Sequence, residues 1–468
     1  MQDRFRFSRF ALVVWVGLIF AVSGAAQAVD TLDPGLKAQI DRIAGQVMEQ
    51  HGVPSASIAV LKGGKLAYTH AYGNAHIHPD VAATPEMRYS IGSISKQFTA
   101  AAILLLQEQG KLSLNDAVGK YVPGLTRGDE VTIRQILSHT SGYQDYWPED
   151  YLMTPMMKPT TAQQILDTWA KKPLDFEPGT QWQYSNTNYV IAGLIVEKVS
   201  GEKLMDFLEE HIFHPLGMRS VWDSDEARLT STDATAYIRA ALGPLRAAPK
   251  EGRGWMFAAG ELAMTPHDLA LWNESLMAQS LLKPESYKEM FTSVKLKDGK
   301  DSNYGLGVFV GKQKGHRFIE HSGEVTGFVS ESYLLPDDGV SAIVLTNHMG
   351  SGAGQMGQLI ANTVAGNKRT EPEEQALDIY RGLQKGRIDR SLLAPNLNDY
   401  FDAQTVADFE SSLAPLGEPL TFSQVADESR GGMTFRAFRI VYATRRLTLT
   451  TYTYPDGKLE QYLVSPAD

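Results

Sequence analysis

Short apolar runs separated by turns predict β-strands in two distant parts of the chain. Residues 55–71 hold two such runs around Lys62-Gly63-Gly64-Lys65, which is typical of a β-hairpin with a glycine turn. Extended runs return between residues 318 and 346, where Pro336-Asp337-Asp338-Gly339 supplies a turn. We therefore expect a sheet assembled from segments that are far apart in the sequence.

The strongest helical pattern covers residues 93–109, where Ala, Ile and Leu are almost continuous and Gly110 ends the segment. A helix that is apolar on all sides is buried. Residues 115–250 look mainly helical and irregular, and a further helical pattern covers 355–364. The expected class is α+β (mixed α/β): an antiparallel β-sheet flanked by helices, interrupted by an inserted, mainly helical lobe.

The composition changes near residue 367. Residues 367–374 are polar and charged, which predicts a linker. Beyond it, helix-like stretches at 375–384 and 403–413 precede alternating runs between 435 and 464. We expect residues 375–468 to form a separate small α+β domain, in which we find no catalytic motif.

Composition and the N-terminus restrict the possible chemistry and location. The 468-residue chain contains no cysteine, which excludes disulfides, thiolate nucleophiles and cysteine-based metal sites. Residues 1–28 are typical of a secretory signal peptide, with arginines before the apolar run 11–20 and a small-x-small sequence, Ala26-Gln27-Ala28, at its end. An uncleaved anchor is the alternative, but a spanning helix needs roughly 20 apolar residues. We expect a periplasmic or secreted protein.

The net charge of −10 bears on the partners of the chain. An acidic surface repels nucleic acids and anionic membranes. We therefore expect a small-molecule or peptide substrate, no nucleic acid, and no integral membrane span after signal cleavage.

The start of the buried helix carries candidate chemistry in Ser93-Ile94-Ser95-Lys96. The i, i+3 spacing places the Ser93 hydroxyl and the Lys96 amine on one helical face, where the amine can orient or deprotonate the hydroxyl. A helix N-terminus favours an anionic oxygen near Ser93, and burial lowers the pKa of Lys96. Taken alone, S-x-x-K is more typical of a serine N-cap followed by a solvated lysine. The sequence contains no G-x-S-x-G, H-E-x-x-H or phosphate-loop motif.

Further motifs follow downstream in a fixed order. They are Leu137-Ser138-His139-Thr140-Ser141-Gly142, Glu177-Pro178-Gly179, Tyr184-Ser185-Asn186, Pro215-Leu216-Gly217-Met218, Ala259-Gly260-Glu261-Leu262, Tyr304-Gly305-Leu306-Gly307 and His321-Ser322-Gly323. Together with S-x-x-K, they resemble the serine β-lactamase and penicillin-binding-protein superfamily, in the branch of class C β-lactamases, serine DD-peptidases, D-aminopeptidases and related esterases. The resemblance covers about residues 36–364 and implies a β-lactamase/transpeptidase-like hydrolase domain over residues 29–366.

The resemblance also implies catalytic roles. Ser93 would be the nucleophile that forms an acyl-enzyme, and Lys96 its proton partner. Tyr184 would be the general base, as a phenolate that takes the Ser93 proton and returns it to the leaving group. No metal and no cofactor are expected.

The substrate-binding residues are implied in the same way. Asn186 would bind the acyl side chain of the substrate, and the backbone N–H groups of the nucleophile and of Glu324 would form the oxyanion hole. The strand with His321, Ser322 and Gly323 would be one wall of the cleft. Lactamases of this superfamily usually have Lys-Thr-Gly here, and a neutral imidazole in place of the lysine would bind a β-lactam carboxylate less well.

These residues predict an exported serine hydrolase that cleaves an amide or ester bond. A peptidase or amidase of the DD-peptidase or D-aminopeptidase kind ranks first, a carboxylesterase second and a β-lactamase third. The alternative from another class is a non-catalytic homologue that binds cell-wall fragments or a partner, with residues 370–468 as the candidate interaction surface. We expect His139 and Ser141 to belong to a structural turn, and the segments 146–172 and 222–253 to determine specificity.

Overall fold

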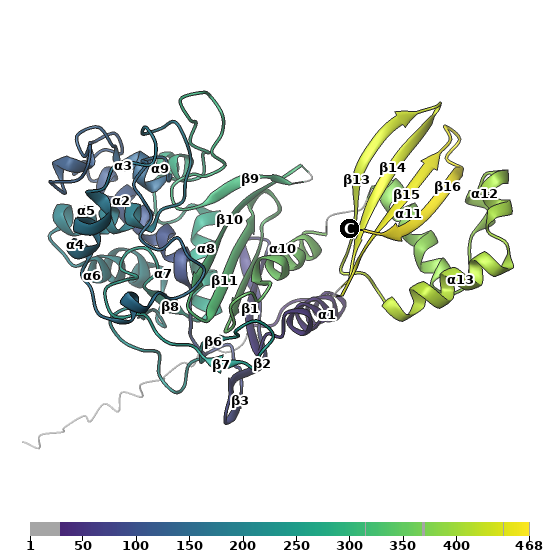
Figure 1. Ribbon diagram of the computed structural model, residues 1–468, viewed down its shortest axis with the longest axis horizontal. Helices are drawn as coiled ribbons and strands as arrows, with labels where there is room; N and C mark the ends of the chain where they lie inside the picture. Colours follow the sequence, from purple (N-terminus) through teal and green to yellow (C-terminus); the bar gives the residue numbers. More distant parts are fainter. Residues whose placement is uncertain (1–28, 314, 367–369, 443, 468) are drawn as a thin grey trace, which may run out of the picture.

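The computed structural model describes residues 29–313, 315–366, 370–442 and 444–467 (Figure 1). Its largest sheet has seven strands, and all neighbouring strands are antiparallel. In spatial order the strands are β3 (Asp80–Ala82), β2 (Lys65–Ile77), β1 (Ser55–Lys62), β12 (Val340–Thr346), β11 (Phe328–Leu335), β10 (His316–Val325) and β9 (Phe309–Gln313). The predicted pairing of distant segments is confirmed, because β1 pairs with β12.

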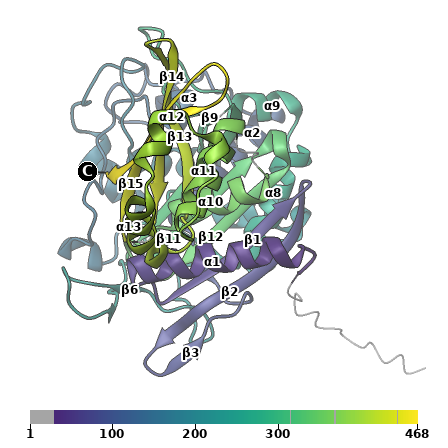
Figure 2. The ribbon, with the colours of Figure 1, turned by 90° about the vertical axis from the view of Figure 1, so that its right-hand side faces the viewer.

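The central strands are buried on both faces, because alternate side chains enter two different hydrophobic cores. In β1, Ile58 and Val60 belong to one core, whereas Ala59 and Leu61 belong to the other. Figure 2 looks toward the face that α1 and α10 cover. The helices that cover the two faces are α1 (Pro34–His51) and α10 (Ala353–Val364) on one side and α8 (Pro266–Ala278) on the other.

The inserted lobe is mainly helical, as predicted, and α2 lies at its centre against α5. The predicted helix 93–109 is divided in the structure: Gly92–Ile94 form a 3₁₀ turn, η1, and the α-helix begins at Ser95. The helices of the lobe are α2 (Ser95–Glu108), α3 (Ile133–Leu137), α4 (Ala162–Ile165), α5 (Asn186–Ser200), α6 (Leu204–Leu208), α7 (His214–Leu216) and α9 (Pro284–Met290). Short strands also pair here, in the order β4 (Tyr89–Ser90), β8 (Leu262–Met264) and β5 (Trp222–Asp223), and separately β6 (Tyr237–Ile238) with β7 (Arg246–Ala247).

Residues 370–467, here called the C-terminal domain, have a hydrophobic core of their own. A four-stranded antiparallel sheet packs against helices, and Figure 1 shows this unit beside α10 and α1, at the end opposite the helical lobe. Its elements are α11 (Glu371–Leu383), α12 (Pro395–Tyr400), α13 (Ala403–Leu413), β13 (Thr421–Arg430), β14 (Met433–Val441), β15 (Arg446–Thr453) and β16 (Leu459–Pro466). Residues 29–366 are called the main domain below.

The predicted linker 367–374 is too long at its C-terminal end. Helix α11 already begins at Glu371, because Thr370 and Glu373 form a capping box, in which each side chain binds the backbone N–H of the other residue. Glu373 is buried and its carboxylate also accepts a hydrogen bond from the backbone N–H of Gln424, 2.7 Å away. The acidic run is therefore the first turn of a helix rather than a solvated linker.

The predicted signal peptide, residues 1–28, lies outside the described residues. Within the described ranges, none of the helices combines the length and the apolar character that crossing a bilayer requires.

Candidate active site

Ser93 and Lys96 meet where the 3₁₀ turn passes into α2. The distance between Lys96 Nζ and Ser93 Oγ is 2.9 Å, so the predicted contact is confirmed. Lys96 is completely buried, and Nζ also lies 2.8 Å from Asn186 Oδ1 and 2.8 Å from the carbonyl oxygen of Ala259. The amine thus has three oxygen partners, of which only Ser93 can also donate a proton.

Burial decides the protonation of Lys96. Desolvation lowers its pKa from 10.5 to about 7, and the negative charges of Asp145 and Glu261 oppose this shift without cancelling it. A large fraction of the side chain is therefore a neutral amine near pH 7. Such an amine can accept the proton of Ser93.

Tyr184 lies beside this pair, but its protonation differs from the expectation. Burial raises the pKa of Tyr184, and the nearby Ser93 hydroxyl only partly opposes the shift. Lys96 Nζ lies 4.9 Å from the centroid of the tyrosine ring, and Tyr184 Oη has no hydrogen-bond partner in the described part of the chain. The raised pKa of Tyr184 disfavours the predicted phenolate, so Lys96 is the stronger candidate for the base, and the catalytic role of Tyr184 stays a prediction.

Two glycines bring β10 against the turn that carries Ser93. A Cβ atom on Gly323 would lie only 1.8 Å from the carbonyl oxygen of Ile91, and one on Gly92 would lie 2.7 Å from the backbone nitrogen of Glu324. No other residue type leaves room for this approach. It places the backbone N–H of Glu324 next to the nucleophile turn, which is the arrangement that the predicted oxyanion hole needs.

The motif His321-Ser322-Gly323 does not line the cavity. His321 is buried, its Nε2 lies 2.8 Å from Tyr304 Oη, and its Nδ1 faces the carbonyl oxygen of Ser322. Burial, with the nearby Lys96 as a smaller cause, lowers the pKa of His321 to about 3, so the ring is neutral. We therefore correct the predicted substrate-binding role of His321, because both ring nitrogens already have partners. Ser322 and Gly323 are likewise absent from the cavity wall.

The turn around His139 supports the segment with Tyr184, as expected for a structural element. The backbone N–H of Ser185 donates to His139 Nδ1 over 3.2 Å, and the N–H of Gln183 donates to the His139 carbonyl oxygen over 3.0 Å. Ser141 Oγ donates to Asn188 Oδ1 on α5 over 2.6 Å. The segment that follows the turn is therefore fixed at both its backbone and its side chains.

A cavity of about 460 Å³ opens in front of Ser93. Tyr184, Asn186 and Glu324 line it, whereas Lys96 lies behind the wall. The cavity wall is acidic and aromatic, and the described residues that form it include no lysine, arginine or histidine. They are Ser93, Asp145, Tyr146, Trp147, Pro148, Glu149, Asp150, Tyr151, Gln183, Tyr184, Asn186, Met256, Ala259, Gly260, Glu324, Val325, Thr326 and Met349.

Asp145 is a functional candidate that the sequence reasoning missed. Its carboxylate accepts hydrogen bonds from the backbone N–H of Asn186 over 2.9 Å and from the Asn186 amide over 3.3 Å. The only signal in the sequence was its place just after the His139 turn, which brings no chemistry by itself. The neighbouring segment 146–151 was expected to influence specificity, and it does form one wall of the cavity.

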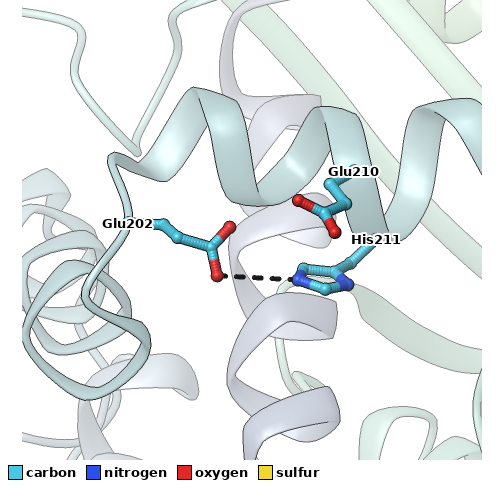
Figure 3. Close-up of side chains that lie close together, drawn as sticks. All are labelled: Glu202, Glu210 and His211. Carbon is cyan, nitrogen blue, oxygen red and sulfur yellow. Dashed lines mark ion pairs between the residues drawn. The ribbon is translucent and has the colours of Figure 1, made fainter.

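One group of possible metal ligands occurs among the described residues, apart from the cavity. Glu202, Glu210 and His211 have ligand atoms within 4.8 Å of one another, and Figure 3 shows His211 paired with Glu202. That pair is 3.7 Å apart, and all three side chains are at least partly exposed. Ion pairing on the surface accounts for such a cluster, so we assign it no metal.

Comparison with known proteins agrees with this geometry. The profile of the family described as Beta-lactamase matches residues 40–365. The chain belongs to the Beta-lactamase family. The match ends before the C-terminal domain begins, and it includes every candidate residue discussed above.

The similar proteins include Protein flp of Staphylococcus aureus, which is 27% identical over 73% of this chain and 69% of that protein, as well as penicillin-binding proteins and an amidohydrolase. Penicillin-binding protein 4* of Bacillus subtilis is 29% identical over 308 residues, which are 63% of this chain and 68% of that protein. A D-stereospecific amidohydrolase from Streptomyces sp. has 27% sequence identity and a TM-score of 0.62, covering 72% of this chain and all of that one. The octameric penicillin-binding protein homologue from Pyrococcus abyssi, at 23% identity and a TM-score of 0.64, shares the fold over 92% of this chain and 96% of its own. These neighbours support a serine-hydrolase function.

Proposed function

We propose that this chain is an exported serine hydrolase that cleaves an amide bond through an acyl-enzyme on Ser93, as a peptidase or amidase for substrates built from D-amino acids. The observation that carries the proposal is the contact between Ser93 and a buried lysine of lowered pKa, at the wall of a cavity. Export rests on the predicted signal peptide. The preference for D-amino acids rests on the similarity to the D-stereospecific amidohydrolase from Streptomyces sp..

Acylation begins with neutral Lys96. Its amine takes the proton of Ser93 Oγ as that oxygen bonds to the substrate carbonyl carbon. The carbonyl oxygen becomes an oxyanion, which accepts hydrogen bonds from the backbone N–H groups of Ser93 and Glu324. Lys96 is then an ammonium, and the Asp145 charge nearby stabilises it.

The leaving amine needs a proton for the C–N bond to break. Tyr184 is a phenol beside Lys96, so it can donate this proton to the nitrogen and recover one from the Lys96 ammonium. Deacylation reverses these transfers. Lys96 takes a proton from a water molecule, the hydroxide attacks the ester carbonyl, and Ser93 leaves with its proton restored.

The charge of the cavity favours a substrate with an amino group. Glu149, Asp150 and Glu324 all line the wall, and burial together with the charge of Asp150 raises the pKa of Glu324, as expected in a negative potential. An ammonium group gains from such a potential, whereas a carboxylate loses. This supports an amidase or aminopeptidase over a β-lactamase, whose substrate carries a carboxylate.

The proposal is tested with p-nitroanilides of D-alanine, L-alanine and N-acetyl-D-alanine. We expect release of nitroaniline from the D compound with a free amine, weaker release from the other two, and none with Ser93→Ala. Equal rates on all three would argue against the substrate class. No Ser93-dependent reaction with these compounds, with a p-nitrophenyl ester or with a penicillin would favour the non-catalytic homologue.

A carboxylesterase is the second candidate, because one side of the same cavity is apolar. Tyr146, Trp147, Met256 and Met349 line it, and such a wall accommodates an apolar acyl chain. Rapid turnover of a p-nitrophenyl butyrate with no anilide cleavage would favour this candidate.

A further inference from the structure

The amine of Lys96 has to point its lone pair at Ser93 in order to act as a base. A neutral amine has two N–H donors and one lone pair. The carbonyl oxygen of Ala259 and Asn186 Oδ1 can only accept, so they take the two donors. The lone pair is then left for Ser93. This arrangement holds only while Asn186 presents its oxygen, and not its NH₂ group, to Lys96.

Asp145 fixes this orientation of the Asn186 amide. Its Oδ2 lies 3.3 Å from Asn186 Nδ2, and a carboxylate can only accept, so the NH₂ group has to face Asp145. Its Oδ1 accepts from the backbone N–H groups of Asn186, over 2.9 Å, and of Trp147, over 3.2 Å. The carboxylate is therefore held by the backbone, and the amide by the carboxylate.

We propose that Asp145 is a positioning residue, which acts through Asn186 to direct the Lys96 amine at Ser93. The inference rests on the proposed hydrolase function, since it concerns the same nucleophile. The chain of contacts runs Asp145, Asn186, Lys96, Ser93, with heavy-atom distances of 3.3, 2.8 and 2.9 Å. Its charge also favours the ammonium that Lys96 becomes during acylation.

Other groups also face Lys96 and influence its titration. Glu261 also attracts the ammonium, less strongly than Asp145 does, and burial raises the pKa of its own carboxyl. The imidazoles of His139 and His321 are neutral because burial lowers their pKa values. The rings of Tyr184 and Tyr189 lie 4.9 and 5.5 Å from Nζ. Burial raises the pKa of Asp145 too, and the backbone N–H groups of Asn186 and Trp147 and the charge of Lys96 oppose that shift. Of the two carboxyls, Asp145 has the larger influence on Lys96.

The experiment measures how fast a fluorophosphonate labels Ser93 between pH 5 and 10, which requires no knowledge of the natural substrate. Serine oxygen bonds to phosphorus, fluoride leaves, and Lys96 takes the proton. In Asp145→Asn, the NH₂ groups of residues 145 and 186 would face each other if Asn186 kept its present orientation. Asn186 would therefore turn its oxygen toward residue 145 and its NH₂ group toward Lys96. We expect the plateau rate to fall by about ten- to a hundredfold. The midpoint of the pH profile should move to lower pH, because a charge that favours the ammonium is gone.

The double variant Asp145→Asn with Asn186→Asp exchanges the two groups. The new amide at 145 can donate to the new carboxylate at 186, which can only accept from Lys96. We expect it to label faster than Asp145→Asn and to have its midpoint above that of the unmodified protein, since the charge is closer to the amine. If Asp145→Asn does not fold, the double variant still tests the proposal through its midpoint, which is compared with that of the unmodified protein. Asp206→Asn, on the exposed face of α6, is the matched control and should change neither quantity.

The outcomes separate this inference from the function on which it rests. Labelling that Ser93→Ala abolishes, together with an unchanged midpoint in Asp145→Asn, would leave the hydrolase intact and overturn the role of Asp145. A double variant that is no faster than the single one would do the same. An unmodified protein that does not react would overturn both proposals.

Discussion

The main domain and the C-terminal domain use similar elements, yet they bury different groups. The main domain buries ionisable side chains that have few or no opposite charges: Lys96, His139, Glu261, His321 and Glu331. In the described part of the C-terminal domain, Glu373 is the single buried charged residue, and it closes a helix cap. Buried charge lowers stability unless it is paired, so its concentration in one domain indicates where chemistry is performed.

The buried tyrosines of the C-terminal domain have conventional partners instead, and among its described residues Gln424 Oε1 is the one buried polar side-chain atom without a partner. Tyr442 Oη donates to Tyr380 Oη over 2.8 Å, and Tyr462 Oη donates to the carbonyl oxygen of Ala376 over 2.7 Å. In the main domain, by contrast, Tyr184 Oη, His139 Nε2 and one carboxylate oxygen of Glu261 have no partner among the described residues. The unpaired buried groups lower the folding stability of the main domain more than that of the C-terminal domain, as is typical of a domain that carries a reactive site.

The largest expected effect comes from the nucleophile. Ser93→Ala should lower turnover of a p-nitrophenyl ester by about 10⁴-fold or more, with little change in thermal unfolding, because the hydroxyl contributes to chemistry rather than packing. Ser429→Ala, on the exposed end of β13, is the same substitution in the other domain and should change neither value. Residual turnover above a tenth of the original would remove Ser93 from the mechanism.

The next effect combines activity and stability. Lys96→Met should lower turnover by about 10²- to 10⁴-fold, as the loss of a base does. Because burial lowers the pKa of Lys96 from 10.5 to about 7, the unfolded chain binds one more proton than the folded one between these pH values. The free energy of unfolding of the original protein should therefore rise by about 2 kcal/mol more between pH 7 and 9 than that of the variant. Urea unfolding at both pH values measures it, and parallel changes in the two proteins would show that Lys96 is not buried as a neutral amine.

A smaller effect is expected at Glu331, which lies on β11 and faces α10. Burial raises the pKa of Glu331 well above its ordinary value, so the fold prefers the protonated acid, and stability is lost as the pH rises from the unfolded pKa through the folded one. Glu331→Gln should therefore be about 1–2 kcal/mol more stable than the original protein at pH 8 and equal to it near pH 4. Urea unfolding provides the measurement, with the exposed Glu428→Gln as the control. A variant that is destabilised at pH 8 would mean that the carboxylate has a partner.

The smallest effect belongs to the C-terminal domain. Tyr442→Phe removes the hydroxyl that donates to Tyr380 and should lower the stability of this domain by about 1 kcal/mol. Hydrolysis should remain unchanged, since the cavity contains no residue of this domain. Unfolding followed by tyrosine fluorescence, beside an assay of turnover, tests both statements, and a loss of turnover would show that the domains are coupled.

Sequence motifs predicted the parts of the site that are local or have a fixed order. The spacing of Ser93 and Lys96 was sufficient to predict their contact, because it depends on a single helical turn. The capping box at Thr370 and Glu373 was also readable, although the charged composition around it favoured a linker instead. The lowered pKa of Lys96 followed from the predicted burial of its helix, whereas the raised pKa of Tyr184 was not predicted, because it depends on how deeply the phenol is buried.

Long-range geometry accounts for what the sequence could not predict. Asp145 has no periodic or motif signal, and its role arises only when the His139 turn brings it against the start of α5. Strand β13 was missed because it is an edge strand whose second half is exposed on both sides, which removes the alternation of apolar residues. The imidazole of His321 was expected to be neutral, but its hydrogen bond to Tyr304 and its absence from the cavity wall depend on long-range packing that no local pattern shows.

The packing of Gly323 on Ile91 has a consequence for when the protein becomes active. The two residues are separated by most of the main domain in the sequence, so the predicted oxyanion hole requires β10 to pack against the turn around Ile91, far earlier in the chain. Such distant pairings form late, because the chain must first close a long loop. A partly folded chain would therefore carry the Ser93 and Lys96 pair on its helix without the ability to stabilise the reaction. The return of hydrolysis after denaturation would mark the completion of the whole sheet, later than the return of helix.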